Sequence, residues 1–449
     1  MIVASLALAA AVLALGAWSI GPTPGYLVYG APVGSGMAAK LLCSSRYVSG
    51  FSREQARSDL EQYSPLLEQV TVNWDDSAKT VTASLFGLSE RTAGFVDGRG
   101  CAVDYGVNPP REPLALDELP PAREPWPLGD AAGRADPELR ELLEDLMRRD
   151  NAAGRNTRAL LVAREGRILA EAYAQETGPS TPLLGWSMSK SLMSVMLANL
   201  EMRGLLRLDR PTGFPEWRDD GRSAILLTDL LTMTDGLEFI EDYSPGDDVT
   251  LMLFTVPAAG EYALRSPLTS EPGSRFSYSS GSASLLSLAH RRAFDSPRQA
   301  LEDFVEHIWR PMGFRNAIFE TDASDLLVGS SYFYASARDW ARIAQLMLNG
   351  GEINGHRIVT EDWVRRAMAV NGSENERAYG YQWWLNSGDE RLRYADLPED
   401  AIFARGNREQ VMMAAPSLGL IVLRLGWTAG DYPTNAIFGE IIDFMGRGS

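Results

Sequence analysis

The sequence predicts an α+β fold in which one sheet is built from both ends of a large C-terminal segment. Residues 157–174 (TRALLVAREGRILAEAYA) have the pattern of two strands joined by a Glu-Gly turn. Residues 402–426 (IFARGNREQVMMAAPSLGLIVLRLG) have the pattern of two β-runs around Pro416–Gly419. The region between these stretches is mostly helical in pattern. Strands at both ends with helices between them indicate one sheet with a helical insert.

Composition limits the class of protein. The 449 residues are enough for two or three domain-sized units, and 45% hydrophobic with 22% charged residues is typical of a globular chain. The formal net charge of −17 argues against nucleic-acid binding and against docking on anionic lipid headgroups, since both need basic surfaces.

The N-terminus predicts export. Residues 1–20 (MIVASLALAAAVLALGAWSI) carry no charged side chain and are just long enough to span a bilayer. They are interpreted as a signal peptide or a retained membrane anchor, which places the protein in the periplasm or on the inner membrane; a buried terminal helix is the alternative. An even pair of cysteines in an exported chain predicts a Cys43–Cys101 disulfide, with two free buried thiols as the alternative.

Three regions follow the N-terminal segment. Residues 37–106 form a small α/β module, residues 107–130 form an extended linker with seven prolines, and residues 131–449 form the main domain. Within the module, the patterns predict one helix and two strands at 52–63, 69–75 and 79–87. In the main domain they predict helices at 136–150, 187–202 (ended by Gly204), 296–314, 337–351 and 434–447.

One lysine in the helix at 187–202 indicates chemistry. The chain has three lysines, Lys40, Lys79 and Lys190, against 39 arginines (42 basic residues less three). An arginine is always charged, whereas a desolvated lysine can lose its proton and act as a base. Lys190 lies three residues after Ser187, so the two share one helix face. A serine at a helix N-terminus with an adjacent base is a candidate nucleophile, and the free backbone N–H groups there suit an oxyanion.

A tyrosine supplies the third candidate group. Tyr278 lies in residues 271–287 (EPGSRFSYSSGSASLLS), after a Pro-Gly turn and before an apolar helical run. A phenol beside an ammonium can be held as phenolate and serve as a base for the serine and then as an acid for the leaving group. The alternative is a buried tyrosine with a satisfied hydroxyl.

These motifs, taken in order, resemble the serine β-lactamase and penicillin-binding-protein superfamily, and within it the class C-like 6-aminohexanoate-dimer hydrolases and esterases. WSMSKS resembles the Ser-x-x-Lys box, and LLTDLLTMTDGLEF resembles the stretch that follows it. EPGSRFSYSSGSASLL resembles the Tyr-x-Asn/Ser box, with Tyr278 and Ser280 in its two positions; later helical stretches match as well. The resemblance covers about residues 150–445 and implies an antiparallel sheet flanked by helices, an all-α lobe, and a site between the lobes.

The third box departs from the family pattern. It reads ARGNREQ at Ala404–Gln410, without the Lys-Thr-Gly lysine that grips a β-lactam carboxylate; Arg405 is the candidate substitute. The resemblance implies that Asn407, after Gly406, offers its backbone N–H to an oxyanion hole beside that of Ser187.

Two further positions depart from the pattern. Glu409 replaces an expected glycine, which bears on the local turn and the pocket size. Asp235 replaces the familiar serine before Gly236, and its role is interpreted as structural.

Rival functions have less support. A Ser-His-Asp hydrolase would need one of His290, His307 and His356, and no Gly-x-Ser-x-Gly elbow is present. No spacing matches a metal-ligand set, so neither metal nor cofactor is expected. A catalytically silent homologue that binds cell-wall peptide or a partner remains the main alternative, together with a true β-lactamase or D-Ala-D-Ala peptidase.

The sequence therefore predicts a serine hydrolase that acts on small-molecule esters or amides of small acids through an acyl-enzyme. Ser187 is the expected nucleophile, with Lys190 and Tyr278 as an acid/base pair. The physiological substrate and the oligomeric state are left open.

Overall fold

A computed structural model of the chain describes residues 24–106, 111–116, 123–131 and 136–447. Its main sheet has six strands in the order β12-β13-β14-β15-β5-β6, and every neighbouring pair is antiparallel. The strands are β12 (Trp384–Leu385), β13 (Ile402–Gly406), β14 (Gln410–Ala415), β15 (Leu420–Gly426), β5 (Thr157–Arg164) and β6 (Arg167–Tyr173). The pairing of β15 with β5 confirms that both ends of the main segment build one sheet.

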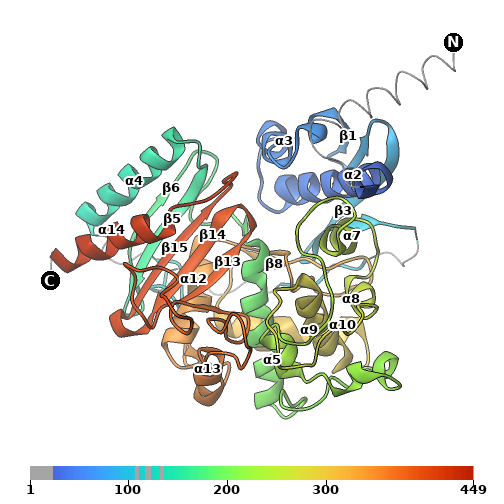
Figure 1. The fold of residues 1–449 in the computed structure, drawn as a ribbon. Helices are drawn as coiled ribbons and strands as arrows, with labels where there is room; N and C mark the ends of the chain where they lie inside the picture. Colours follow the sequence, from blue (N-terminus) through green and yellow to red (C-terminus); the bar gives the residue numbers. More distant parts are fainter. Residues whose placement is uncertain (1–23, 107–110, 117–122, 132–135, 448–449) are drawn as a thin grey trace.

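Helices cover both faces of this sheet (Figure 1). α4 (Pro137–Ala152) and α14 (Thr434–Arg447) pack on one face, and α12 (Ala337–Leu348) packs on the other. Alternate residues of β5 therefore enter different cores: Leu160 joins the cluster under α4, and Leu161 joins the main cluster. Burial on both faces explains why this strand is an almost continuous apolar run.

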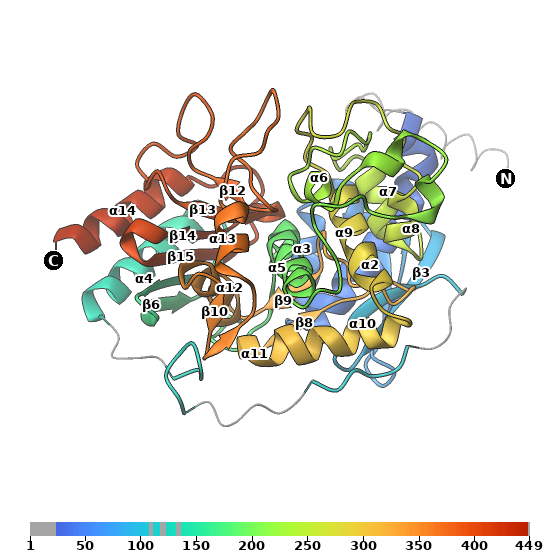
Figure 2. The ribbon, with the colours of Figure 1, turned by 90° about the horizontal axis from the view of Figure 1, so that it is seen from below.

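A helical lobe follows the first hairpin. Its helices are α5 (Ser189–Met202), α6 (Leu227–Leu231), α7 (Asp248–Phe254), α8 (Ala259–Ala263), α9 (Ser280–Arg292), α10 (Pro297–Phe304) and α11 (Arg310–Met312). A small sheet, β7 (Leu183–Leu184), β9 (Phe333–Ala335) and β8 (Ala317–Phe319), lies under them, and β10 (Glu352–Ile353), β11 (His356–Arg357) and α13 (Glu361–Ala367) follow α12. Figure 2 shows α5 between the main sheet and the other helices of the lobe.

One predicted strand is divided in the structure. The run expected from residue 402 to Pro416 folds back on itself at Asn407–Glu409, so that β13 and β14 pair as a hairpin. Arg408 and Glu409 both have positive φ, 61° and 60°, which residues of these types seldom adopt. The two positions that need a positive φ are therefore not glycines, and the glycine beside them, Gly406, has an extended backbone.

The N-terminal module consists of α2 (Pro24–Tyr47), α3 (Arg53–Glu61) and a meander of β1 (Val70–Asp75), β2 (Thr80–Leu85), β3 (Leu88–Val96) and β4 (Gly100–Asp104). Among the described residues its first helix, α2, begins at Pro24, ahead of residue 37, where the sequence prediction placed the start of the module. The Cys43–Cys101 disulfide joins α2 to β4.

Buried polar contacts join the module to the lobe and the sheet. Lys40, which is 3% exposed, forms an ion pair with the fully buried Glu320, and Glu320 also accepts hydrogen bonds from the Ser44 hydroxyl (2.8 Å) and the Cys101 N–H (2.7 Å). A single hydrophobic cluster runs from Val33 in α2 to residues that follow β15. The module is therefore packed into the rest of the molecule.

The predicted linker is partly described, and there it packs against the protein. Trp126 is buried and donates its indole N–H to the Arg338 carbonyl oxygen at 3.1 Å. Residues 1–20, predicted to be a signal peptide or anchor, lie outside the described residues. Among the helices that the structure describes, none has the length and apolar character needed to cross a membrane.

Candidate active site

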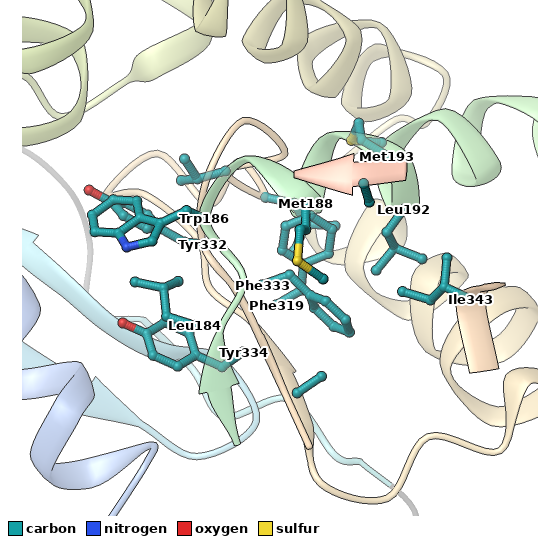
Figure 3. Close-up of a cluster of buried hydrophobic side chains, with 14 of the residues drawn as sticks. Leu184, Trp186, Met188, Leu192, Met193, Phe319, Tyr332, Phe333, Tyr334 and Ile343 are labelled. Atoms are coloured by element: carbon teal, nitrogen blue, oxygen red, sulfur yellow. The ribbon is translucent and has the colours of Figure 1, made fainter. Parts of the chain in front are cut away.

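Ser187 lies in a single 3₁₀ turn, Trp186–Met188, that leads into α5. Trp186 has a left-handed backbone conformation at φ 49°, which is costly for a tryptophan. This conformation sets the direction of the backbone at the next residue, Ser187. Figure 3 shows Trp186 beside Tyr332, with Met188 turned the other way toward Phe333. Buried side chains on both sides hold this turn in place, while Ser187 itself keeps partial exposure.

The end of β13 comes very close to this turn. A Cβ atom on Gly406 would lie 2.0 Å from the carbonyl oxygen of Gly185 and 3.2 Å from the backbone nitrogen of Ser187. Its φ of −142° is ordinary extended backbone, so the need for glycine here is one of space. The structure thus brings the predicted Gly406–Asn407 segment beside Ser187.

Lys190 uses all three of its N–H groups in this site. It donates to the Ser187 hydroxyl at 2.9 Å, to the Ser280 hydroxyl at 3.1 Å and to the Ser330 carbonyl oxygen at 3.0 Å. The side chain is 1% exposed. Burial lowers the pKa of Lys190 to about 8, and the negative charge of Glu241 opposes part of that fall.

Glu241 orients Ser280. Its carboxylate accepts the Ser280 hydroxyl proton at 2.5 Å and the Ser280 backbone N–H at 2.8 Å. Because that proton points at Glu241, the oxygen of Ser280 can only accept from Lys190. Burial raises the pKa of Glu241, whereas the Lys190 ammonium lowers it.

Tyr278 lies beside Ser187 and Lys190 and completes the group of candidate catalytic side chains. The Lys190 ammonium lies 4.9 Å from the centre of the Tyr278 ring, and the nearby Ser187 hydroxyl acts to lower the pKa of Tyr278. The ring stacks on Trp384 at 5.3 Å and meets Tyr379 edge-on at 6.1 Å. Burial and the Glu241 charge raise the pKa of Tyr278 above its ordinary value, so the resting group is a neutral phenol and not the phenolate considered from the sequence.

The other members of the third box lie at the edge of the site. Arg405 is 3.7 Å from Glu409, and its positive charge acts on Tyr278. Burial raises the pKa of Glu409. Asn407 lines a cavity together with Trp186.

Asp235 stabilises the loop before the site. It is buried and accepts hydrogen bonds from the Leu237 N–H (2.9 Å) and the Ser282 hydroxyl (2.6 Å), which tie this loop to the start of α9. Burial raises its pKa to about 6.

The histidines lie outside this cluster. His290 is buried in α9, where burial lowers its pKa to about 3, and His307 pairs with Asp303. In the described parts of the chain, no three His, Cys, Asp or Glu side chains are grouped so that they could hold a metal ion.

Sequence reasoning missed three residues of the site: Glu241, Tyr243 and Ser330. Burial and the charge of Glu241 raise the pKa of Tyr243, and Ser330 contributes only its backbone carbonyl. The loops at 238–270 carried no readable motif, and a backbone acceptor leaves no trace in residue types. The one available signal for Glu241 was its place in residues 239–243 (FIEDY), where acidic residues lie between two aromatic residues.

Comparison with known proteins identifies the family. The Beta-lactamase family model matches residues 139–433. This chain belongs to the β-lactamase family. The 6-aminohexanoate-dimer hydrolase of Paenarthrobacter ureafaciens is 26% identical in an alignment of 299 residues, and the match covers 61% of this chain and 73% of the relative.

Solved structures share the fold. EstCE1, a hydrolase with promiscuous acyltransferase activity, superposes with a TM-score of 0.58 at 16% identity, over 68% of this chain and 97% of that protein. A class C beta-lactamase gives a TM-score of 0.53 at 12% identity, over 70% and 98%. The α+β, β-lactamase-like fold predicted from the sequence is confirmed, and the chain is a β-lactamase-related serine hydrolase.

Proposed function

We propose that this protein hydrolyses esters, and more slowly amides, of small carboxylic acids through an acyl-enzyme on Ser187. The observation that carries the proposal is the hydrogen-bond arrangement of Lys190. Ser330 offers only a carbonyl acceptor, and Ser280 is held as an acceptor by Glu241. When Lys190 is neutral, these two contacts take its two N–H groups, and its lone pair faces the Ser187 hydroxyl.

Each group then has one task in acylation. Ser187 Oγ attacks the carbonyl carbon as its proton passes to Lys190 Nζ. The backbone N–H groups of Ser187 and Asn407 are assigned to the developing oxyanion. The bond to the leaving oxygen or nitrogen breaks as the neutral Tyr278 donates its proton to that atom, and the phenolate then takes back the proton held by Lys190.

Deacylation repeats these steps with water. A water molecule gives one proton to the base and attacks the ester carbon, and Ser187 leaves with a proton returned to its oxygen. Hydrolysis therefore consumes one water, and every side chain ends in its starting state.

Esters rank above amides as substrates because an alkoxide or phenoxide leaves more readily than an amine. The amide candidates come from the 6-aminohexanoate-dimer hydrolase among the relatives. β-Lactams rank last, because the third box has no lysine and Arg405 already lies near Glu409. In a panel of p-nitrophenyl butyrate, a linear amide and nitrocefin, we expect activity in that order; efficient nitrocefin hydrolysis without esterase activity would reverse the ranking.

Export is part of the proposal. It is supported by the charge-free N-terminal stretch and by the Cys43–Cys101 disulfide, since disulfides persist in oxidising compartments.

A fluorophosphonate probe tests the nucleophile directly. We expect labelling of the wild type and of Ser277→Ala, an exposed serine next to Tyr278, with the adduct mapped by mass spectrometry to Ser187. Labelling that persists in Ser187→Ala, or an unlabelled wild type, would show that the assignment is wrong.

A further inference from the structure

A cavity of about 170 Å³ lies between the N-terminal module and the helical lobe, where α2 packs beside α7 (Figure 1). The module supplies one wall, which includes Val33, Met37 and Leu67, and the lobe supplies Phe254 and Trp186. None of the described residues that line it is charged. Most of the wall comes from residues outside 139–433, the part that the family model matches.

The cavity begins beside the nucleophile. Trp186 immediately precedes Ser187, and Asn407 immediately follows the glycine that touches the Ser187 turn. Tyr243 lines the cavity, and the charge of Glu241, the residue that orients Ser280, raises the pKa of Tyr243. The cavity therefore borders the turn that carries Ser187, while the Ser187 side chain itself does not line it.

The position of Tyr278 indicates whether the cavity faces the acyl group or the leaving group of the substrate. The leaving group must lie at the proton donor Tyr278, whose ring contacts Trp384 and Tyr379. None of these three aromatic residues lines the cavity. The cavity adjoins Trp186 and Asn407, on the oxyanion side, so it faces the acyl group.

We propose that this cavity binds an uncharged, unbranched aliphatic acyl chain of about six carbons, and that the N-terminal module thereby sets the acyl specificity. This inference rests on the proposed function. An apolar cavity of about 150 Å³ is large enough for benzene, so 170 Å³ suits a chain of similar carbon count. A terminal ammonium would be buried here without a charged partner, which is strongly unfavourable.

A series of p-nitrophenyl esters tests the proposal with the full-length protein. Each buried methylene should raise kcat/KM by about fourfold, which makes hexanoate about 200-fold better than acetate, with no further gain for much longer chains. The 6-aminohexanoate ester has the same chain length as hexanoate and should be about 100-fold worse or poorer still. Equal turnover of these two esters would overturn the proposal.

Substitutions at one position change the cavity in opposite directions. Met37→Trp should lower the hexanoate-to-acetate ratio of kcat/KM at least tenfold. Met37→Ala should move the optimum to a longer chain. Val28→Trp introduces the same side chain on the same helix at a site that is 64% exposed and lines no part of the cavity, so its ratio should match the wild type.

The outcomes separate the two proposals. A flat chain-length profile, or Met37 variants that behave like Val28→Trp, would refute the acyl cavity and leave acetate hydrolysis and Ser187 labelling in place. Absence of ester hydrolysis and of labelling in the wild type would instead refute the proposed function. If Met37→Trp fails to fold, as judged by thermal unfolding, the shift expected for Met37→Ala still decides the question.

Discussion

Glu241→Gln is predicted to move the pH profile of the enzyme to lower pH. In the proposed mechanism Lys190 is neutral when it accepts the proton of Ser187, so kcat/KM should rise with pH through about 8, the pKa to which burial lowers this lysine. The charge of Glu241 raises that pKa. Removing the charge therefore lowers the pKa of Lys190 further, and the neutral base appears at lower pH.

The structure sets the size of this effect. The Lys190–Ser280 and Ser280–Glu241 hydrogen bonds are 3.1 and 2.5 Å long, so the two charges are at most about 5.6 Å apart. At that separation and an effective dielectric constant of about 20, the interaction is about 3 kcal/mol, or about two pH units. Glutamine keeps the size of the side chain and can hydrogen-bond Ser280.

The assay is kcat/KM for p-nitrophenyl butyrate between about pH 6 and about pH 10, with the rising limb fitted to one pKa. Glu238→Gln is the matched control, because it removes a carboxylate from the same loop at an exposed position. An unchanged limb in Glu241→Gln would mean that Glu241 carries no charge in the resting enzyme. A limb moved to higher pH would refute Lys190 as the base.

Three other substitutions test the site and the module. Lys190→Arg keeps the charge but cannot release a proton, so kcat should fall by about 10²- to 10⁴-fold; the larger side chain at this buried position should also cost about 1–3 kcal/mol in the free energy of unfolding. Gly406→Ala places a methyl group 2.0 Å from the Gly185 carbonyl oxygen, so the turn must shift, and kcat/KM should fall with a loss of about 1–3 kcal/mol in the free energy of unfolding. Replacing Cys43 and Cys101 by serine opens a loop with a sequence separation of 58 and should cost about 4 kcal/mol in urea unfolding; non-reducing peptide maps of envelope-fraction protein should show the bridge.

The sheet and its helices could be predicted because their signals are local. Alternation, turn residues and helix ends located β5, β6, α4, α12 and α14 within a few residues, and the pairing of the two ends followed from the order of elements. The hairpin turn at Asn407–Glu409 could not be predicted, because its positive φ angles fall on an arginine and a glutamate. The buried Arg424, which is distant in sequence, donates hydrogen bonds to the carbonyl oxygens of Arg408 (3.2 Å) and Glu409 (2.7 Å) and so holds the turn.

Some contacts of the candidate site could likewise be predicted from local sequence, and others could not. Ser187 and Lys190 are three residues apart, and one helical turn is enough to bring them together. Glu241 and Ser280 are separated by 39 residues of loops and short helices, and nothing local predicts their contact. The rarity of lysine in this chain does not by itself identify a catalytic lysine. Lys40 is equally rare and buried, but its amine forms an ion pair with Glu320, away from Ser187.

The module is more than an attachment to the family domain, because its contacts with the rest of the chain include buried charges. Besides Lys40–Glu320, Asp59 of α3 pairs with Arg158 of β5 at 2.5 Å, and both side chains are at most 10% exposed. Breaking one partner of such a pair leaves a buried charge uncompensated, at a cost of about 3–5 kcal/mol. Trp427, directly after β15, also donates its indole N–H to the Asp59 carbonyl oxygen at 2.9 Å. The wall that the module contributes to the proposed acyl cavity is therefore fixed to the same sheet that ends beside Ser187, and a rigid wall is what the proposed discrimination between acyl chains requires.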